Sequence, residues 1–337
     1  METFREKVKR LYYGISPQYR TLRRIEAQLQ QLRDQMDALS QKGEAMFWWQ
    51  MQRPGESMEQ TRTRVFLAMP PAEGRLREIQ MGNFAALQRL RQICEANRLS
   101  FWLMGGTLLG AVRHNGFIPW DDDVDVGMLR GDLEKLAEIL ADDPVYVLRP
   151  FYRTDWKSFL YKMVCRAPGQ PYWVDIFHYD GVDSRAQGAE RTWERIRALR
   201  EKNEAEKARI GRTLSRCYRD EPLEPADLER LEAARRRLQA EMPAEGEPDC
   251  LYRSLDTVYL GNEALLPQSA IFPLAEGTFE GERYPIPNRW RELLEQGYGA
   301  YMGLPPDVRP AHTIMYRTAE WTQEAARLFD LDENNQK

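Results

Sequence analysis

The hydrophobic positions change their spacing along the chain, and each spacing predicts a different element. From Leu22 to Leu39 they alternate three and four steps apart on an Arg- and Gln-rich background, which is the heptad spacing of a coiled coil. Ser16-Pro17 is typical of the start of this helix. Because the seam covers only about two and a half heptads, self-association through residues 18–40 and packing on the protein's own body both stay open.

Residues 75–188 alternate between helical and strand patterns. Helices are predicted from about Arg75 to Asn97 and over 132–141, where apolar residues recur on one face. Short apolar runs predict strands at "LSFWL", "VYVL" (145–148), "YKMVC" (161–165) and "YWVDIFHYD" (172–180). The pattern predicts an α/β (α+β) fold, a mixed sheet flanked by helices.

The other segments have their own composition. Residues 1–52 are predicted to be helical, and 53–74, which are rich in Pro and Gly, to be a linker or extended crossing. Residues 189–248 are rich in Arg, Glu, Ala and Leu, which indicates an inserted helical hairpin. Residues 249–325 are predicted to return to mixed structure and complete the α/β domain, with a β-hairpin turning at Glu276-Gly277 and a helix over 288–296, before a tail at 326–337.

An aromatic cluster lies at the end of the first helix. Phe47, Trp48 and Trp49 occur in "AMFWWQM". Docking into the core is the favoured interpretation, and anchoring at a membrane interface is the alternative.

Charge and cysteine content exclude several classes of function. Lys and Arg total 48 against 52 for Asp and Glu, so the chain has no general electrostatic affinity for nucleic acid. The four cysteines lie far apart and do not form a zinc or disulfide pattern. The first residues are too charged for a signal peptide. We therefore expect a cytoplasmic protein. Peripheral attachment to the inner face of the membrane is compatible with this location.

Four of the five residues from Asp121 to Asp125 are aspartates. In a strand, Asp121, Asp123 and Asp125 would lie on one face, and Asp122 with the valines on the other. Carboxylates this close repel one another unless a cation neutralises them. Mg²⁺ is therefore expected at Asp123 and Asp125, with Asp121 as an auxiliary ligand. A solvated acidic turn or a calcium loop is the alternative, which the interleaved valines and the lack of EF-hand spacing disfavour.

A glycine pair precedes the aspartates. Gly105, Gly106 and Thr107 follow an apolar run and begin a short predicted helix, so backbone N–H groups and the positive helix end would face a phosphate. Further along, Asp175 lies between two apolar residues in "WVDIF". It is the candidate third metal ligand, and a purely structural acid is the alternative.

These blocks resemble the DNA polymerase beta-type nucleotidyltransferase fold, which pairs such a helix start with two strand carboxylates and a third from a neighbouring strand. More closely, "GGTLLGAVRHNGFIPWDDDVDV", "VDIF" and "YGAYMGLPPDVRPAH" resemble the LicD/fukutin-related family of phosphotransferases. The resemblance spans roughly residues 75–180 and 279–312. The N-terminal helix and the helical insert lie outside it.

The resemblance implies transfer of phosphocholine or an alditol phosphate from a CDP-linked donor to a glycan or lipid-linked glycan, with release of CMP. Lipopolysaccharide and teichoic acid are acceptors of this kind. Asp123, Asp125 and Asp175 would hold one or two Mg²⁺ ions, which Mn²⁺ could replace. Two rivals are a nucleotidyltransferase that releases pyrophosphate and an inactive coiled-coil assembly protein.

Basic residues are needed to hold the donor. Arg113, inside the matching block, is the first candidate because guanidinium binds phosphate bidentately, and an ion pair with a neighbouring aspartate is its alternative. His114, Lys162 and Arg309 are further phosphate-binding candidates. Two aromatic residues of the last block are expected to pack rather than to bind: Tyr298 and Tyr301.

Overall fold

The computed structural model describes residues 17–153, 158–167, 172–214, 221–222, 225–242, 246–255 and 265–304. The chain divides into two compact units, with a boundary between Val65 and Phe66; residues 302–304 belong with the N-terminal unit. Among the described residues, no helix combines the length and the apolar character needed to cross a bilayer.

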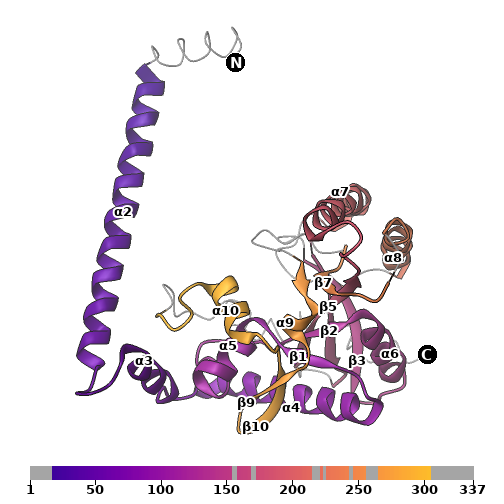
Figure 1. The fold of residues 1–337 in the computed structure, drawn as a ribbon, viewed down its shortest axis with the longest axis horizontal. Coiled ribbons are helices and arrows are strands. Elements are labelled where there is room, and N and C mark those ends of the chain that lie inside the picture. The colour runs from indigo at the N-terminus through magenta and orange to yellow at the C-terminus, as the bar shows by residue number, and fades with distance from the viewer. Residues whose placement is uncertain are drawn as a thin grey trace. The chain divides into compact units, whose positions relative to one another are not determined.

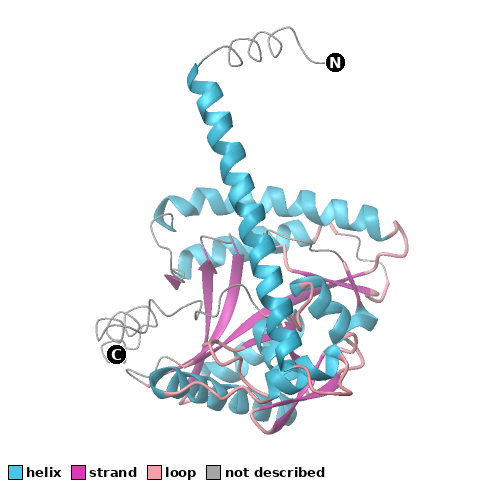
Figure 2. Ribbon diagram, turned by 90° about the vertical axis from the view of Figure 1, so that its left-hand side faces the viewer, coloured by secondary structure: helices cyan, strands magenta, loops and turns pink. Residues whose placement is uncertain are grey.

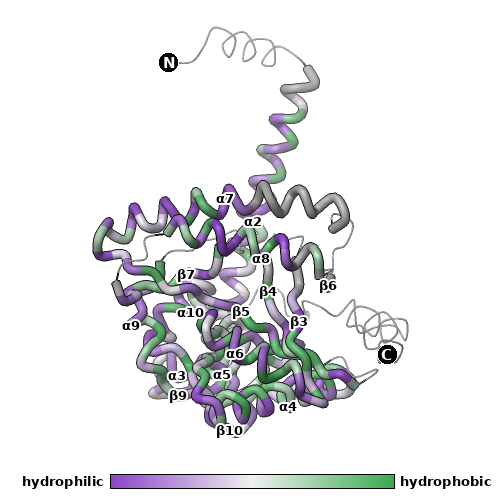
Figure 3. Tube along the Cα trace, turned by 90° about the vertical axis from the view of Figure 1, so that its right-hand side faces the viewer, coloured by the Kyte–Doolittle hydropathy of each residue, from purple (hydrophilic) through white to green (hydrophobic). Residues whose placement is uncertain are grey.

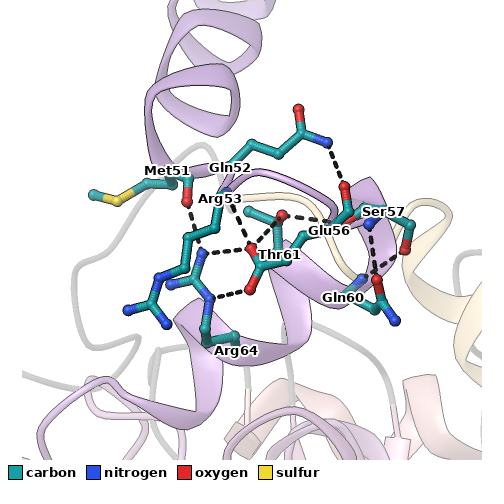
Figure 4. Close-up of polar contacts among 8 residues, drawn as sticks. All are labelled: Met51, Gln52, Arg53, Glu56, Ser57, Gln60, Thr61 and Arg64. Carbon is teal, nitrogen blue, oxygen red and sulfur yellow. Dashed lines mark hydrogen bonds and ion pairs between the residues drawn. The ribbon is translucent and has the colours of Figure 1, made fainter.

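The N-terminal unit consists mainly of helix α2 (Pro17–Met51), followed by α3 (Met58–Leu67), whose last residues enter the larger unit. The segment 53–74, predicted as a linker or extended crossing, therefore contains a helix. A capping box begins it, because Ser57 N–H donates to Gln60 Oε1 at 2.8 Å and Gln60 N–H donates to Ser57 Oγ at 3.2 Å (Figure 4). An extended conformation is therefore wrong for residues 58–67, because the prediction gave more weight to the Pro and Gly residues on either side than to this helix start.

The turn between α2 and α3 is closed by an ion pair. Arg64 Nε and Nη2 donate to the Glu56 carboxylate at 2.7 and 2.8 Å, and Arg64 also donates to the carbonyl of Met51 at 2.7 Å (Figure 4). The hydrogen bond from Arg64 lowers the pKa of Glu56 to about 2. The chain reversal is thus fixed by side chains of this unit.

The aromatic cluster at the end of α2 has two different environments. Trp48 is buried, and its ring N–H donates to Glu44 at 2.9 Å while the Arg62 guanidinium lies 5.4 Å from its ring centroid. Trp49 is 77% exposed. Docking, the favoured interpretation, therefore holds for Trp48 and not for Trp49.

The larger unit is built on a mixed sheet, so the predicted fold class is confirmed (Figures 1 and 2). The strand order is β1-β2-β5-β4-β3-β6, β7 pairs with β5 and β8, and within this sheet only β2 and β5 run parallel among the described strands. The strands are β1 (Phe101–Leu103), β2 (Asp125–Leu129), β3 (Tyr146–Arg153), β4 (Ser158–Cys165), β5 (Trp173–Val182), β6 (Glu221–Pro222), β7 (Cys250–Arg253) and β8 (Leu266–Pro267).

Helices cover this sheet and bury its apolar residues. One large core joins the buried faces of α4, α5 and α6 to β1, β2, β4 and β5. A second, smaller core lies between the predicted insert, which forms α7 and α8, and β7. The helices are α4 (Gly74–Asn97), α5 (Gly105–His114), α6 (Arg130–Ala141), α7 (Ala189–Leu214), α8 (Pro225–Gln239), α9 (Gln268–Ile271) and α10 (Trp290–Tyr298).

The predicted C-terminal hairpin is present, but its turn lies elsewhere. Strands β9 (Ala275–Phe279) and β10 (Glu282–Ile286) are joined at Glu280-Gly281, not at Glu276-Gly277. Both turn residues have positive φ, 49° and 79°, as the favoured two-residue hairpin turn requires. Glu280 tolerates this because its carboxylate is held by Arg77 at 2.6 Å and by the Phe117 N–H at 3.0 Å.

Candidate active site

Three carboxylates meet where the two parallel strands lie side by side. Asp125, the first residue of β2, is in register with Asp175 of β5. One oxygen each of Asp123, Asp125 and Asp175 can be chosen so that all three lie within 4.8 Å of one another. A set of oxygen ligands this close suits a hard divalent cation such as Mg²⁺.

The aspartates reach this position through an extended segment rather than a strand. The sequence predicts a strand from Asp121, but β2 begins at Asp125. The predicted alternation still holds in burial, because Asp122 and Val124 are fully buried while Asp121 and Asp123 are partly exposed. Side chains from α4 bind two of its backbone carbonyls, and its Val124 carbonyl accepts from the backbone N–H of Asp175 at 2.8 Å.

Two buried polar residues of α4 make these contacts, and sequence reasoning missed both. Gln80 donates to the carbonyl of Asp121 at 2.7 Å, and Asn83 donates to that of Asp122 at 2.8 Å. Asn83 also accepts from the N–H of Trp173 at 2.9 Å. One helix therefore holds both the aspartate segment and the start of β5. The sequence signal was the presence of two amides on the otherwise apolar face of that helix.

The glycine pair allows the helix start to lie directly against the carboxylates. A Cβ on Gly105 would lie 2.5 Å from Asp125 Oδ2, and one on Gly106 would lie 2.6 Å from Asp121 Oδ2. Gly105 also has a φ of +55°, which glycine adopts most easily. Next to them, Thr107 Oγ1 accepts the N–H of Asp125 at 2.8 Å. The space that side chains would fill is thus occupied by acidic oxygens.

Asp175 is held by a lysine that was predicted to bind phosphate. Lys162 on β4 lies opposite it in register, and its Nζ is 2.7 Å from Asp175 Oδ1. Both side chains are buried, and the ring N–H of Trp173 donates to Asp175 Oδ2 at 3.2 Å. Lys162 contacts the Asp175 carboxylate directly, as a residue that orients a metal ligand does.

The electrostatics of the cluster favour a bound cation. Burial, with the carboxylates of Asp123, Asp175 and Asp121, raises the pKa of Asp125 well above its usual range, and Arg253 opposes that shift. A divalent ion would remove the mutual repulsion. The acidic oxygens, their spacing and the raised pKa together fit a divalent metal ion held by Asp123, Asp125 and Asp175.

A cavity of about 280 Å³ is lined in part by Asp125. Its walls include Trp102 of β1, Phe177 of β5 and Tyr298 of α10. Arg253, at the end of β7, also lines it, and its guanidinium lies 4.5 Å from the centroid of the Phe177 ring. The cavity is therefore lined by aromatic rings, by the Arg253 guanidinium and by the Asp125 carboxylate.

The helical insert holds the end of β7 in place. Arg200 on α7 donates to the carbonyls of Arg253 and Ser254, the latter at 3.2 Å, and Asn203 donates to that of Leu255 at 3.1 Å. The Ser254 hydroxyl also accepts from Arg130 at 2.7 Å. Arg130 in turn makes two hydrogen bonds, of 2.5 and 2.8 Å, to the buried carboxylate of Asp180. The insert thus supports the segment that carries the cavity's arginine.

Comparison with protein families identifies the domain that carries these features. Residues 98–206 match the model of the LicD/FKTN/FKRP family, nucleotidyltransferase domain. Over these residues the chain is similar to the LicD/FKTN/FKRP family. The predicted family resemblance is confirmed, and the match contains the glycine pair and all four aspartates predicted as metal ligands.

Two relatives are named as transferases of phosphate-containing groups. The lipopolysaccharide cholinephosphotransferase LicD of Haemophilus influenzae is 29% identical over 266 residues, which cover 70% of this chain and 96% of the relative. The ribitol 5-phosphate transferase FKRP of Homo sapiens is 51% identical over 47 residues, which cover 14% of this chain and 10% of the relative.

Within residues 98–206, the structure places Arg113 and His114 in a packed layer. Arg113 is buried, donates to the carbonyl of Tyr301 at 2.9 Å and to His114 Nε2 at 3.1 Å, and lies 4.4 Å from the centroid of the Phe66 ring. Burial lowers the pKa of Arg113 to about 10 and that of His114 to about 4. His114 is therefore neutral at pH 7, accepting at Nε2 and donating from Nδ1 to the carbonyl of Phe66 at 3.2 Å. Arg309, the remaining phosphate-binding candidate, lies outside the described residues.

Proposed function

We propose that this chain transfers a substituted phosphate, such as phosphocholine or an alditol phosphate, from a CDP-linked donor to a hydroxyl of a glycan, with release of CMP. The observation that supports it best is the acidic cluster of Asp123, Asp125 and Asp175 between a glycine helix start and an aromatic cavity. Both relatives are named as transferases of phosphate-containing groups, and the name of one includes lipopolysaccharide, which supports a glycan acceptor.

The reaction is a direct displacement at phosphorus. The acceptor oxygen bonds to the distal phosphorus of the donor, the bond from that phosphorus to the bridging oxygen breaks, and its electron pair leaves on CMP. The hydroxyl proton passes to solvent. A bound Mg²⁺, or Mn²⁺ in its place, supplies positive charge that lowers the pKa of the acceptor hydroxyl and stabilises the departing phosphate.

The protein's own groups position the reactants. Asp123, Asp125 and Asp175 would hold the metal, and Asp121, which lies against Gly106, would be a further oxygen ligand. The N–H groups at the start of α5 face phosphate oxygens. Lys162 keeps Asp175 oriented through their 2.7 Å ion pair. The cavity receives the organic part of the donor, with Arg253 as a hydrogen-bond donor to it.

Product analysis tests the proposal. The full chain is incubated with Mg²⁺, a glycan acceptor, and CDP-choline, CDP-ribitol or CDP-glycerol in turn, and nucleotide products are separated by chromatography. We expect CMP from at least one CDP donor, at a rate that depends on the acceptor. Release of pyrophosphate from CTP, with no CMP from any CDP donor, would show a nucleotidyltransferase and overturn the proposal. Asp142→Asn, which changes an exposed acid directly after the end of α6, serves as the control for surface charge.

A further inference from the structure

Helix α2 presents a continuous stripe of large apolar side chains to solvent. Every residue from 21 to 43 is exposed among the described residues, and the stripe alternates with polar positions along the helix (Figure 3). Its members are 46–69% exposed. They are Leu22, Ile25, Leu29, Leu32, Met36 and Leu39.

We propose that α2 pairs with α2 of a second copy of this chain, in an antiparallel coiled coil. The stripe has strict heptad spacing, with Leu22, Leu29 and Met36 at a positions. Burying such a seam against an identical one removes the apolar surface of both helices from water. A single exposed apolar residue needs no partner, but six apolar residues at heptad spacing on one helix form a contiguous patch of the kind that marks an interface.

The charges beside the seam select the antiparallel orientation. Glu26 and Arg33 occupy e positions, while the g positions of the same heptads hold Gln28 and Gln35. In a parallel pair, e positions face g positions of the partner, so neither charge meets its opposite. In an antiparallel pair, e faces e, and Glu26 of each copy lies beside Arg33 of the partner subunit, twice by symmetry.

The same pairing fixes the register. Leu29 then layers on Leu32 of the partner subunit, and Leu22 on Leu39 of the partner subunit, so that all six apolar layers are filled. Within its own helix, Glu26 contacts Arg23 at 3.6 Å with both side chains more than half exposed. Such an exposed pair contributes little and does not compete with the pairing between copies.

Molar mass measured by light scattering tests the dimer in the full chain. We expect twice the chain mass for the wild type and for Gln31→Lys, a control on the opposite face. Leu29→Lys introduces the same charge into the seam and should give the mass of one chain. A wild-type mass of one chain, or a dimer that Leu29→Lys leaves intact, would overturn the proposal. Binding of a single chain to phosphatidylglycerol vesicles, lost in Leu29→Lys, would identify a membrane as the partner and also overturn it.

Charge exchange tests the orientation. Glu26→Arg and Arg33→Glu each bring like charges together twice, so each should weaken self-association about tenfold. Mixing the two single variants, or combining both changes in one chain, should restore it. Equal association of all these variants would contradict the antiparallel pairing.

Disulfide trapping gives a second test of orientation. In the antiparallel pair, Leu22 of one copy lies opposite Leu39 of the partner subunit. Because Leu22 and Leu39 are 17 residues apart in each helix, the two Leu22 residues lie about 25 Å apart along the helix axis. Leu22→Cys should therefore cross-link with a Leu39→Cys chain and not with itself. Cross-linking of Leu22→Cys with itself would show a parallel pair.

Discussion

The acidic edge and the cavity beside it share one residue, Asp125, and differ in every other respect. The acidic edge, which we define as Asp121, Asp123, Asp125 and Asp175, gathers negative charge against a helix start that has no side chains there. The cavity is lined mainly by apolar and aromatic groups and carries one arginine. In the proposed reaction the difference separates two tasks: the edge would hold a metal ion at the reacting phosphate, and the cavity would bind the rest of the donor. Changes to the edge should lower kcat, and changes to the cavity should raise KM.

The largest effect is expected from Asp125→Asn. Loss of a group that supports transition-state charge costs about 10²–10³-fold in kcat, and we expect at least this loss of CMP release. The control, Asp142→Asn, should retain full activity. If Asp125→Asn keeps wild-type kcat, the acidic edge does not take part in the reaction.

The same variant should be more stable than the wild type without metal. Because folding raises the pKa of Asp125, the folded state keeps a proton that the unfolded state releases. Stability of the metal-free protein therefore falls as pH rises above the ordinary carboxyl pKa, until the raised folded pKa is passed. Asp125→Asn removes this term, so its Tm in EDTA at pH 8 should exceed that of the wild type by several degrees. If the difference in Tm between Asp125→Asn and the wild type is the same at pH 5 and at pH 8, the raised pKa of Asp125 is contradicted.

Gly105→Ala should have the next largest effect. Its Cβ would displace the Asp125 carboxylate, which lies 2.5 Å away, and its positive φ would be strained. Misplacement of a reacting group by about 1 Å can cost 10²-fold, so we expect kcat to fall by up to about 10²-fold. Gly131→Ala is the matched control, because no atom lies within 4 Å of its added Cβ. Equal activity of both variants would show that the close approach is dispensable.

A change in the cavity should act on KM. Arg253→Gln removes a charged donor, and we expect KM for the CDP donor to rise roughly tenfold, with kcat nearly preserved. Arg283→Gln, whose side chain is 74% exposed, is the control. Arg200→Ala removes the hydrogen bonds from α7 to the end of β7, and it should raise KM by less than Arg253→Gln does. A fall in kcat with unchanged KM would place Arg253 with the acidic edge instead.

The smallest effect is expected from Tyr298→Ala. This half-exposed ring lines the cavity, and loss of one aromatic contact should raise KM roughly 2- to 10-fold. Met81→Ala, an exposed change on α4, should leave KM unchanged. Wild-type KM in Tyr298→Ala would support packing as the role of this tyrosine, which is what the sequence predicts.

The two regions also differ in how far the sequence predicts them. Asp121 to Asp125 are neighbours in the chain, and alternation along an extended backbone is a local property, so their arrangement could be predicted. The cavity draws Trp102, Phe177, Arg253 and Tyr298 from four elements, and only the folded chain brings them together.

The wrong predictions have local physical causes. The strand was expected to begin at Asp121 because extended residues alternate with or without strand pairing, whereas Gln80 and Asn83 hold that segment. The hairpin turn was placed at the first Glu-Gly pair, and the chain turns at the second. The capping residue Ser57 could have predicted the start of helix α3, but the prediction followed the surrounding prolines and glycines instead.

The most direct test of the central claim is metal binding at the acidic edge, measured by the loss of the free Mn²⁺ signal in electron paramagnetic resonance. The full chain is titrated with Mn²⁺ in the presence of CDP, beside Asp125→Asn and the control Asp142→Asn. We predict saturable binding by the wild type and by Asp142→Asn, displaced by excess Mg²⁺, and a large loss of affinity in Asp125→Asn. Equal Mn²⁺ binding by all three proteins would contradict the account.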